Sequence, residues 1–167
     1  MSLREGAGAT AKPVGSVRPV VTIQKIAVAY DGEAPAAAAL REAADLARST
    51  GASLTLVTVV PSTLRAIGVE LPPGSSPIEV EADARAQVEA ARAKLEHDGL
   101  RSVTATVLLG EAVDRVVDFC VAQHVDLLVV GSRGLSGTGR FFLGSVSDGI
   151  LHHAPCSVLV VKSPPKS

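Results

Sequence analysis

Short runs rich in apolar residues recur along this chain at regular intervals. They cover residues 26–29, 54–60, 127–130 and 158–161. Runs of this length and composition are typical of strands that are buried on both faces of a parallel sheet. Residues 103–107 instead alternate Val or Ala with Thr, which predicts a half-exposed strand at a sheet edge. The pattern therefore predicts five strands.

The segments between these strands carry apolar residues at the spacing of an amphipathic helix. The first expected helix has Pro35 in its first turn, and the second begins at the capping box of residues 76–79. The third covers residues 113–120 and the fourth residues 145–153. Gly51 and Gly99 stand where the first and second helix should end, because glycine readily adopts the left-handed conformation that terminates helices. Four helices thus separate the five strands.

Alternation of strands and helices predicts a doubly wound α/β fold with one five-stranded parallel sheet. Right-handed crossovers leave few topologies, and the most economical gives the strand order 3-2-1-4-5 with helices on both faces. We expect this domain to span residues 23–162. Residues 1–22 show no regular period and are expected to form an N-terminal extension, and residues 163–167 a C-terminal tail.

Topology also predicts where such a fold binds its ligand. Open doubly wound sheets hold ligands beyond the carboxyl ends of the strands, at the point where the winding reverses. Here this point lies between the first strand, which ends at Asp31-Gly32, and the fourth, which ends at Gly131-Ser132-Arg133-Gly134. Two distant and unusual stretches of sequence should therefore meet at the predicted crevice.

The backbone of the glycine-rich loop suits a phosphate group. Gly131 and Gly134 are expected to allow positive φ angles and close approach of a ligand to the backbone. Gly144-Ser145 begins the following helix, whose free N–H groups and partial positive charge favour an anion. The alternative is that these glycines only form turns in a surface loop.

Three side chains add candidate contacts at the same place. Arg133 and Arg140 could neutralise anionic oxygens, and Asp31 could accept hydrogen bonds from ribose hydroxyls or an adenine amino group. The alternatives are that Arg133 is only solvated and that Asp31 forms a turn with Gly32. The sequence contains neither a Walker A loop, since Arg140-Phe141 replaces the required Lys and Ser or Thr, nor a G-x-G-x-x-G fingerprint.

Composition excludes several classes of partner. The 167 residues carry a net charge of −1, so no basic field favours nucleic acid or an acidic membrane surface. No apolar run is long enough to span a bilayer. Cys120 and Cys156 form no CxxC motif, and we expect both to be reduced core thiols in a cytoplasmic protein. No set of protein residues with the spacing of a metal site is expected.

The spacing Gly131-x2-Gly134-x9-Gly144-Ser145 resembles the ATP-binding signature of the universal stress protein family. The likeness extends from residue 23 to 162 and includes Asp31-Gly32, Gly110 and the closing Ala-Pro-Cys-Ser segment at 154–157. It implies a small cytoplasmic protein that binds ATP, with or without Mg²⁺, and forms a homodimer through the last strand, residues 157–161. An apolar strand at a sheet edge independently favours such pairing.

The same resemblance implies roles for individual residues. Asp31 would contact the nucleoside and Val59 the adenine, while the motif glycines and Ser145 would hold the phosphates. The predicted nucleotide-binding set consists of Asp31, Val59, Gly131, Arg133, Gly134, Gly144, Ser145 and Val146. One departure is Glu33, which stands where the family often has serine after the Asp-Gly pair. Its charge raises the question of repulsion near the phosphates.

Three functions remain open on this basis. The first is a nucleotide-binding regulatory or stress-response protein with little or no hydrolysis. The second is a slow ATPase, and the third is a dimeric interaction module whose pocket is empty or takes cyclic AMP. Phosphoryl transfer needs a metal clamp and a group that positions the nucleophile. Glu33, Glu111 and Asp148 form no evident pair for this purpose, so we predict no catalytic residues.

Overall fold

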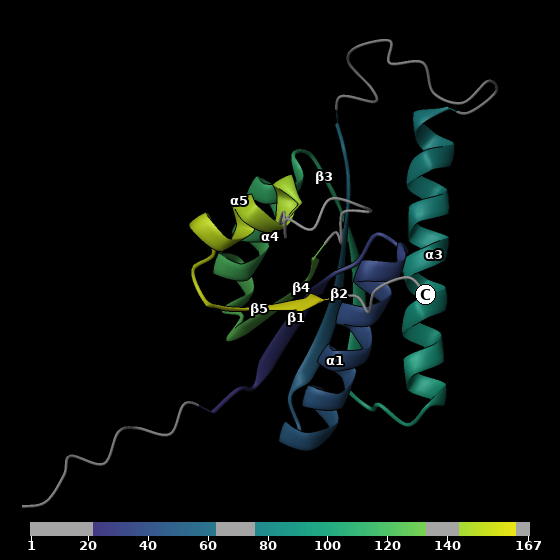
Figure 1. Cartoon of the computed structure of the whole chain (residues 1–167). Helices are drawn as coiled ribbons and strands as arrows, with labels where there is room; N and C mark the ends of the chain where they lie inside the picture. Colours follow the sequence, from purple (N-terminus) through teal and green to yellow (C-terminus); the bar gives the residue numbers. More distant parts are fainter. Residues whose placement is uncertain (1–21, 63–75, 133–143, 163–167) are drawn as a thin grey trace, which may run out of the picture.

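The computed structural model describes residues 22–62, 76–132 and 144–162, which form one α/β domain (Figure 1). Its elements are β1 (Lys25–Ala29), α1 (Ala34–Thr50), β2 (Ser53–Val60), α3 (Pro77–His97), β3 (Val103–Leu109), α4 (Ala112–Gln123), β4 (Leu127–Ser132), α5 (Ser145–His153) and β5 (Ser157–Lys162). The five strands are parallel and lie in the order β3-β2-β1-β4-β5. The fold and strand order predicted from the sequence are confirmed.

Two helices cover each face of the sheet, with α1 and α3 on one side and α4 and α5 on the other (Figure 1). Successive residues of β1 point alternately toward the helices on the two faces of the sheet. Ile26 and Val28 pack into the core beneath α1 and α3, whereas Ala27 packs into the core beneath α4 and α5. This alternation follows from the two-residue period of a strand. It explains why the buried residues of β1 and β4 are apolar on both faces of the sheet.

The helix ends follow the local signals in the sequence. At α3 the Ser76 hydroxyl accepts a hydrogen bond from the Glu79 N–H, and the Glu79 carboxylate accepts one from the Ser76 N–H. This reciprocal pair satisfies two N–H groups that a helix start leaves without partners. Gly51 ends α1 in the left-handed conformation, at φ 75°. The expected capping box and glycine stop are both confirmed.

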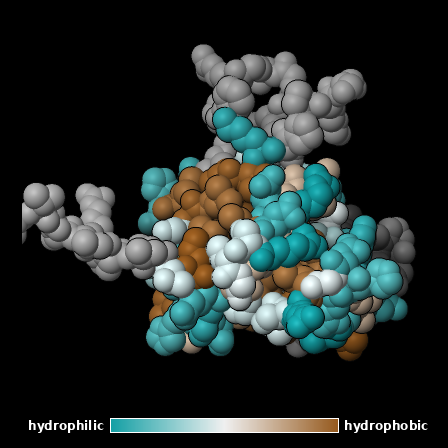
Figure 2. Space-filling model, turned by 90° about the horizontal axis from the view of Figure 1, so that it is seen from below, coloured by the Kyte–Doolittle hydropathy of each residue, from teal (hydrophilic) through white to brown (hydrophobic). Residues whose placement is uncertain are grey.

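The edge strand β5 leaves apolar side chains partly open to solvent. Its residues Val158, Leu159, Val160 and Val161 are all half-buried, in contrast to the fully buried residues of β1 and β4. Figure 2 shows the hydrophobic area where β5 reaches the surface, bordered by polar side chains. Among the helices of the described residues, none combines the length and apolar character needed to cross a membrane.

Candidate functional site

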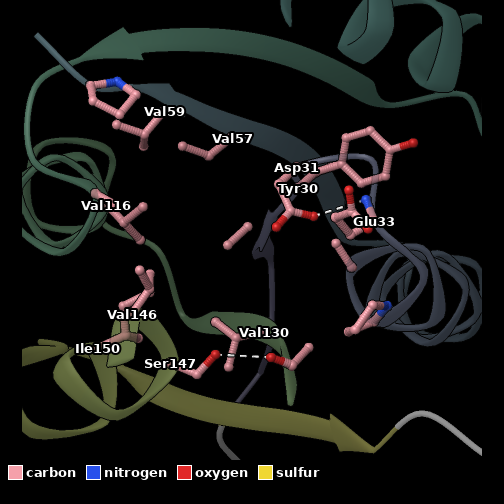
Figure 3. A pocket seen from close by; sticks show the side chains of 16 residues that line it. Tyr30, Asp31, Glu33, Val57, Val59, Val116, Val130, Val146, Ser147 and Ile150 are labelled. Atoms are coloured by element: carbon pink, nitrogen blue, oxygen red, sulfur yellow. Dashed lines mark hydrogen bonds between the residues drawn. The ribbon is translucent and has the colours of Figure 1, made fainter. Parts of the chain in front are cut away.

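A cavity of about 280 Å³ opens at the carboxyl ends of β1 and β4, where the strand order reverses. Residues of β1, β2, β4, α1, α4 and α5 contribute to its wall, so segments far apart in the sequence meet here (Figure 3). Open α/β sheets bind ligands at this point. The cavity thus lies where the sequence predicted a binding site.

Aliphatic side chains form most of the cavity wall. Val57 and Val59 come from β2, Val116 from α4, Val130 from β4 and Ile150 from α5. Figure 3 shows these side chains arranged around the cavity, on the sides away from the first turn of α1. An apolar lining with a few polar groups is the usual character of a small-molecule site. This part of the wall suits the faces of a planar, weakly polar ring.

Carboxylates stand on the opposite side, in the loop between β1 and α1. Asp31 Oδ1 accepts a hydrogen bond from the Glu33 N–H at 3.0 Å, which fixes the turn around Gly32, at φ 80°. Asp31 therefore does form a turn with Gly32, which was the alternative to a binding role, and it also lines the cavity. Both Asp31 and Glu33 border the cavity, and the described wall residues include neither lysine nor arginine.

Gly131 has a different role from the one predicted. A positive φ was expected at this residue, but among the described residues the positive-φ glycines are 32, 51, 99 and 110, so that prediction is wrong. Gly131 lies within β4 in extended backbone. A Cβ there would lie 2.5 Å from both the carbonyl carbon and oxygen of Pro35. The residue is a glycine because the start of α1 packs directly onto β4.

The first turn of α5 closes the cavity from below in Figure 3. Gly144 is its N-cap residue, and this residue has no side chain to cap the free N–H groups of the turn. Val146 lines the cavity, while the buried Ser147 hydroxyl donates a hydrogen bond to the Gly131 carbonyl at 2.9 Å (Figure 3). This bond fixes the helix start against the end of β4. Because Gly144 supplies no side-chain cap, the N–H groups at this helix start can receive an anion.

The structure brings together half of the predicted site residues. Asp31, Val59, Gly131 and Val146 line the cavity. Gly144 and Ser145 lie next to it at the start of α5, without lining it. Arg133 and Gly134, like the rest of residues 133–143, lie outside the described residues.

Several wall residues were missed from the sequence. They are Val57, Val116, Val130, Ser147 and Ile150. Val57 had a usable signal, since it stands two residues before Val59 and therefore on the same side of β2. Val116 and Ile150 carried no such signal, because apolar residues on a helix face look alike whether they border a cavity or fill a core.

The two cysteines lie far apart in sequence but are neighbours in the fold. Both are free thiols, as expected. Cys120 lies in α4 and Cys156 directly precedes β5, and the two thiols interact with each other. Burial, with a smaller effect of the adjacent Cys156, raises the pKa of the Cys120 thiol to about 12. Cys156 is only partly buried, so its assignment to the closed core is corrected. In the described residues, no group of His, Cys, Asp or Glu is placed to hold a metal ion.

Comparison with known proteins identifies the family to which this chain is related. A sequence profile described as the Universal stress protein family matches residues 22–162. A universal stress protein of Thermus aquaticus is 31% identical over 140 residues, which cover 82% of this chain and 97% of that protein.

Two solved structures share the fold. One is a universal stress protein in complex with cAMP, with a TM-score of 0.64, 24% identity and coverage of 86% of this chain and 99% of the other. The second is the universal stress protein from Archaeoglobus fulgidus in complex with dAMP, with a TM-score of 0.61, 23% identity and coverage of 84% and 99%. The family profile covers the whole described domain, and the chain therefore belongs to the universal stress protein family.

Proposed function

We propose that the chain binds an adenine nucleotide, ATP, in the cavity at the carboxyl ends of β1 and β4 and acts as a regulatory stress-response protein. The observation that carries this proposal is the cavity itself, with an aliphatic wall on one side and Asp31 on the other. The adenine would lie between Val57, Val59 and Val116. Asp31 would accept hydrogen bonds from ribose hydroxyls. Related structures contain cAMP and dAMP, which supports an adenine nucleotide as the ligand class.

The phosphates would extend from the cavity toward the start of α5. The N–H groups of its first turn offer donors, and Gly144 and Ser145 stand at this end. Arg133 and Gly134 belong to this part of the proposal through the sequence motif alone. Mg²⁺ would accompany ATP through its phosphate oxygens, with no ligand from the protein.

The proposal includes little or no hydrolysis. Efficient phosphoryl transfer requires charge neutralisation and a group that orients the attacking water. The described cavity wall contributes two carboxylates, Asp31 and Glu33, which do not neutralise phosphate charge. A turnover on the order of 10 per second, typical of ordinary enzymes, would contradict this part. Phosphate release from Mg²⁺-ATP measures it directly.

Cyclic AMP is the second candidate ligand. Glu33 lines the cavity close to Asp31, and it repels a triphosphate more strongly than a singly charged cyclic phosphate. Replacement of Glu33 by serine, the residue common in the family, should therefore improve ATP affinity more than cyclic AMP affinity. An equal effect on both ligands would remove this argument for cyclic AMP.

Calorimetric titration of the nucleotide-stripped protein with ATP, ADP, AMP and cyclic AMP, with and without Mg²⁺, tests the ligand. Tightest binding of ATP supports the main proposal, tightest binding of cyclic AMP supports the second candidate, and no binding overturns both. Val59→Phe fills the cavity wall and should weaken every ligand, whereas Val121→Phe on the exposed face of α4 is the matched control. Gly134→Val should weaken the phosphate-bearing ligands by placing a Cβ in the loop.

The proposal further includes a homodimer in the cytoplasm, formed through residues 157–161 of β5. The half-buried apolar side chains of this edge strand and the hydrophobic area in Figure 2 support it. The free thiols Cys120 and Cys156 favour a reducing compartment.

A further inference from the structure

A second cavity, of about 420 Å³, lies between α1 and α3. Its floor is aliphatic, with Leu40 and Ala44 from α1 and Ala91 and Leu95 from α3. Ala44, Leu40 and Leu95 belong to the buried core, so the floor is fixed by the packing of both helices on the sheet. The small side chains Ala44 and Ala91 leave the space open. This cavity is a groove with a preformed apolar base.

Tyr30 separates this groove from the first cavity, since it lines both. Figure 3 shows its ring turned away from the first cavity, with the hydroxyl directed toward α3. The ring therefore adds an aromatic surface and one polar group to the inner end of the groove. Among the described residues no other lines both cavities, so a ligand in the groove would occupy a site of its own.

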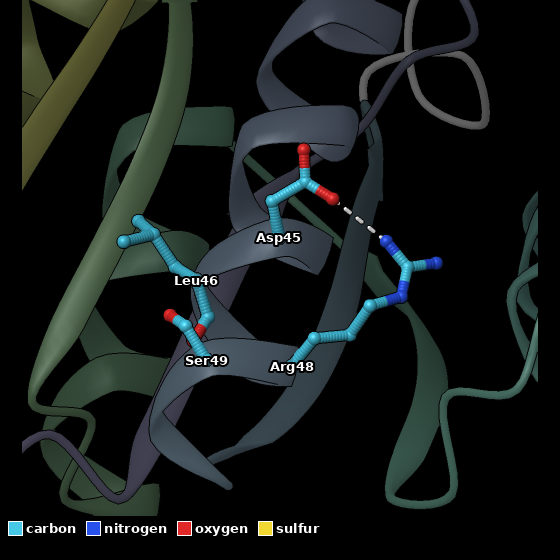
Figure 4. A network of polar contacts seen from close by, with 4 residues as sticks. All are labelled: Asp45, Leu46, Arg48 and Ser49. Atoms are coloured by element: carbon cyan, nitrogen blue, oxygen red, sulfur yellow. Dashed lines mark hydrogen bonds and ion pairs between the residues drawn. The ribbon is translucent and has the colours of Figure 1, made fainter.

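The rim of the groove carries an excess of positive charge. Arg41, Arg48 and Lys94 border it, against the carboxylates Asp45 and Asp98. Arg48 is already neutralised, because its Nη1 lies 2.8 Å from Asp45 Oδ1 along one turn of α1 (Figure 4). Within the described part of the chain, neither Arg41 nor Lys94 has an ion-pair partner. Besides the Arg48–Asp45 pair, the rim therefore carries two cations, one from each helix, against the single carboxylate of Asp98.

We propose that this groove binds a small amphipathic anion, a carboxylate with a medium-length aliphatic chain. The chain would lie over Leu40, Ala44 and Ala91, and the carboxylate would meet Arg41 and Lys94. An apolar lining with a few well-placed polar groups is the pattern of a small-molecule site. Charge complementarity selects an anion over a neutral or cationic amphipath, because two cations outweigh the one remaining carboxylate at the rim of the groove.

Titration of the full-length protein with sodium decanoate tests the proposal. Calorimetry should show one site per chain. The double variant Arg41→Glu/Lys94→Glu should weaken binding by roughly tenfold or more, because two charge-assisted contacts become repulsive. Arg101→Glu, a single charge reversal of the same kind at an exposed position outside the groove, is the control and should bind as the parent does.

Two further measurements test whether decanoate binds in the groove itself. Ala91→Leu fills the floor from α3 with a good helix former and should abolish decanoate binding while circular dichroism and thermal unfolding remain close to those of the parent. AMP binding should be unchanged in all of these variants. Decanoate that competes with AMP, or that binds the double charge variant as tightly as the parent, would overturn the proposal. The titration with decanoate therefore tests the groove separately from the proposed nucleotide site.

Discussion

Gly131 has no room for a side chain, because the first turn of α1 lies against β4. A Cβ at this position would meet the Pro35 carbonyl group at 2.5 Å. The obstacle is backbone, which cannot rotate aside. We expect Gly131→Ala to lower the free energy of unfolding by about 1–3 kcal/mol through overpacking. Urea denaturation followed by circular dichroism measures this change.

Gly149→Ala is the matched control for this prediction. A Cβ at Gly149, within α5, would lie 2.8 Å from a Val113 side-chain methyl group. This side chain can change its position, and alanine also favours the helix by about 1 kcal/mol over glycine. The control should therefore cost less stability than Gly131→Ala. Equal losses would show that the contact with Pro35 is not the cause.

Asp126, which directly precedes β4, ties the loop after α4 to the start of β1. Its Oδ2 accepts hydrogen bonds from the backbone N–H groups of Gln24 and Lys25, each at 2.9 Å. These bonds hold the pKa of the Asp126 carboxyl below its ordinary value of 3.8. A carboxyl with a lowered pKa in the folded state stabilises the fold above its unfolded pKa. That contribution is lost as the pH falls through the lower, folded value.

The substitution Asp126→Asn should therefore have an effect that depends on pH. We expect the free energy of unfolding at pH 7 to fall by about 1 kcal/mol, a modest figure because solvent reaches the site. The difference between variant and parent should shrink as the pH falls below about 4. Urea midpoints measured across pH 3–7 check this. A difference that stays constant over that range would contradict the role of the charge.

At the level of elements, α4 ends on a residue that does not suit its conformation. His124 caps the helix in the left-handed region, at φ 53°, where glycine is the usual residue. His124→Gly should raise the free energy of unfolding by about 1 kcal/mol, because this conformation destabilises a residue with a Cβ by roughly that amount. Thermal unfolding would show a higher midpoint.

Gln123→Gly provides the comparison one residue earlier. Gln123 is the last residue of α4, where glycine loses helix propensity and gains nothing from its freedom at positive φ. This variant should be less stable than the parent by up to about 1 kcal/mol. The two adjacent substitutions therefore have opposite expected signs. If both destabilised the protein, the left-handed cap would not be a source of strain.

The elements themselves were predictable because each carries a local periodic signal. The helix at 145–153 and the capping box at Ser76 were found where the sequence placed them. The role of Gly131 was not predictable, because it depends on Pro35, which lies almost a hundred residues away in the chain. The contact between Cys120 and Cys156 depends in the same way on the neighbouring positions of α4 and β5. Local patterns specify elements, and only their packing specifies which distant residues meet.

The candidate site was predictable to the same degree. Its position followed from topology, since the reversal between β1 and β4 can be inferred from the order of elements alone. Asp31 was predicted from its position at a strand end and Val59 from the family resemblance, and both line the cavity. The wall residues Val116 and Ile150 were not, because the cavity exists only where α4 and α5 approach the sheet. A sequence thus indicates the strand-end residues of such a site more readily than the helix residues that complete its wall.

On the scale of the whole molecule, the two edges of the sheet differ. At one edge β3 ends in Leu109, which is 41% exposed, and α3 packs over the strand. At the other edge β5 presents a continuous apolar run from Val158 to Val161, each residue half-buried. An apolar edge strand favours pairing with another strand, and a second copy of the chain offers an identical one. This asymmetry predicts that β5, rather than β3, would form the interface of the proposed dimer.

A lysine placed on each edge tests that prediction. Val161→Lys should convert the proposed dimer to a monomer, since charged residues on an edge strand oppose pairing and the long side chain can extend its ammonium group into water. Leu109→Lys introduces the same charge at the end of β3 and should leave the dimer intact. Sedimentation velocity at micromolar concentration distinguishes the two species. A parent protein that sediments as a monomer, or two variants that dissociate alike, would show that β5 is not the interface, and its apolar edge would then require a different partner.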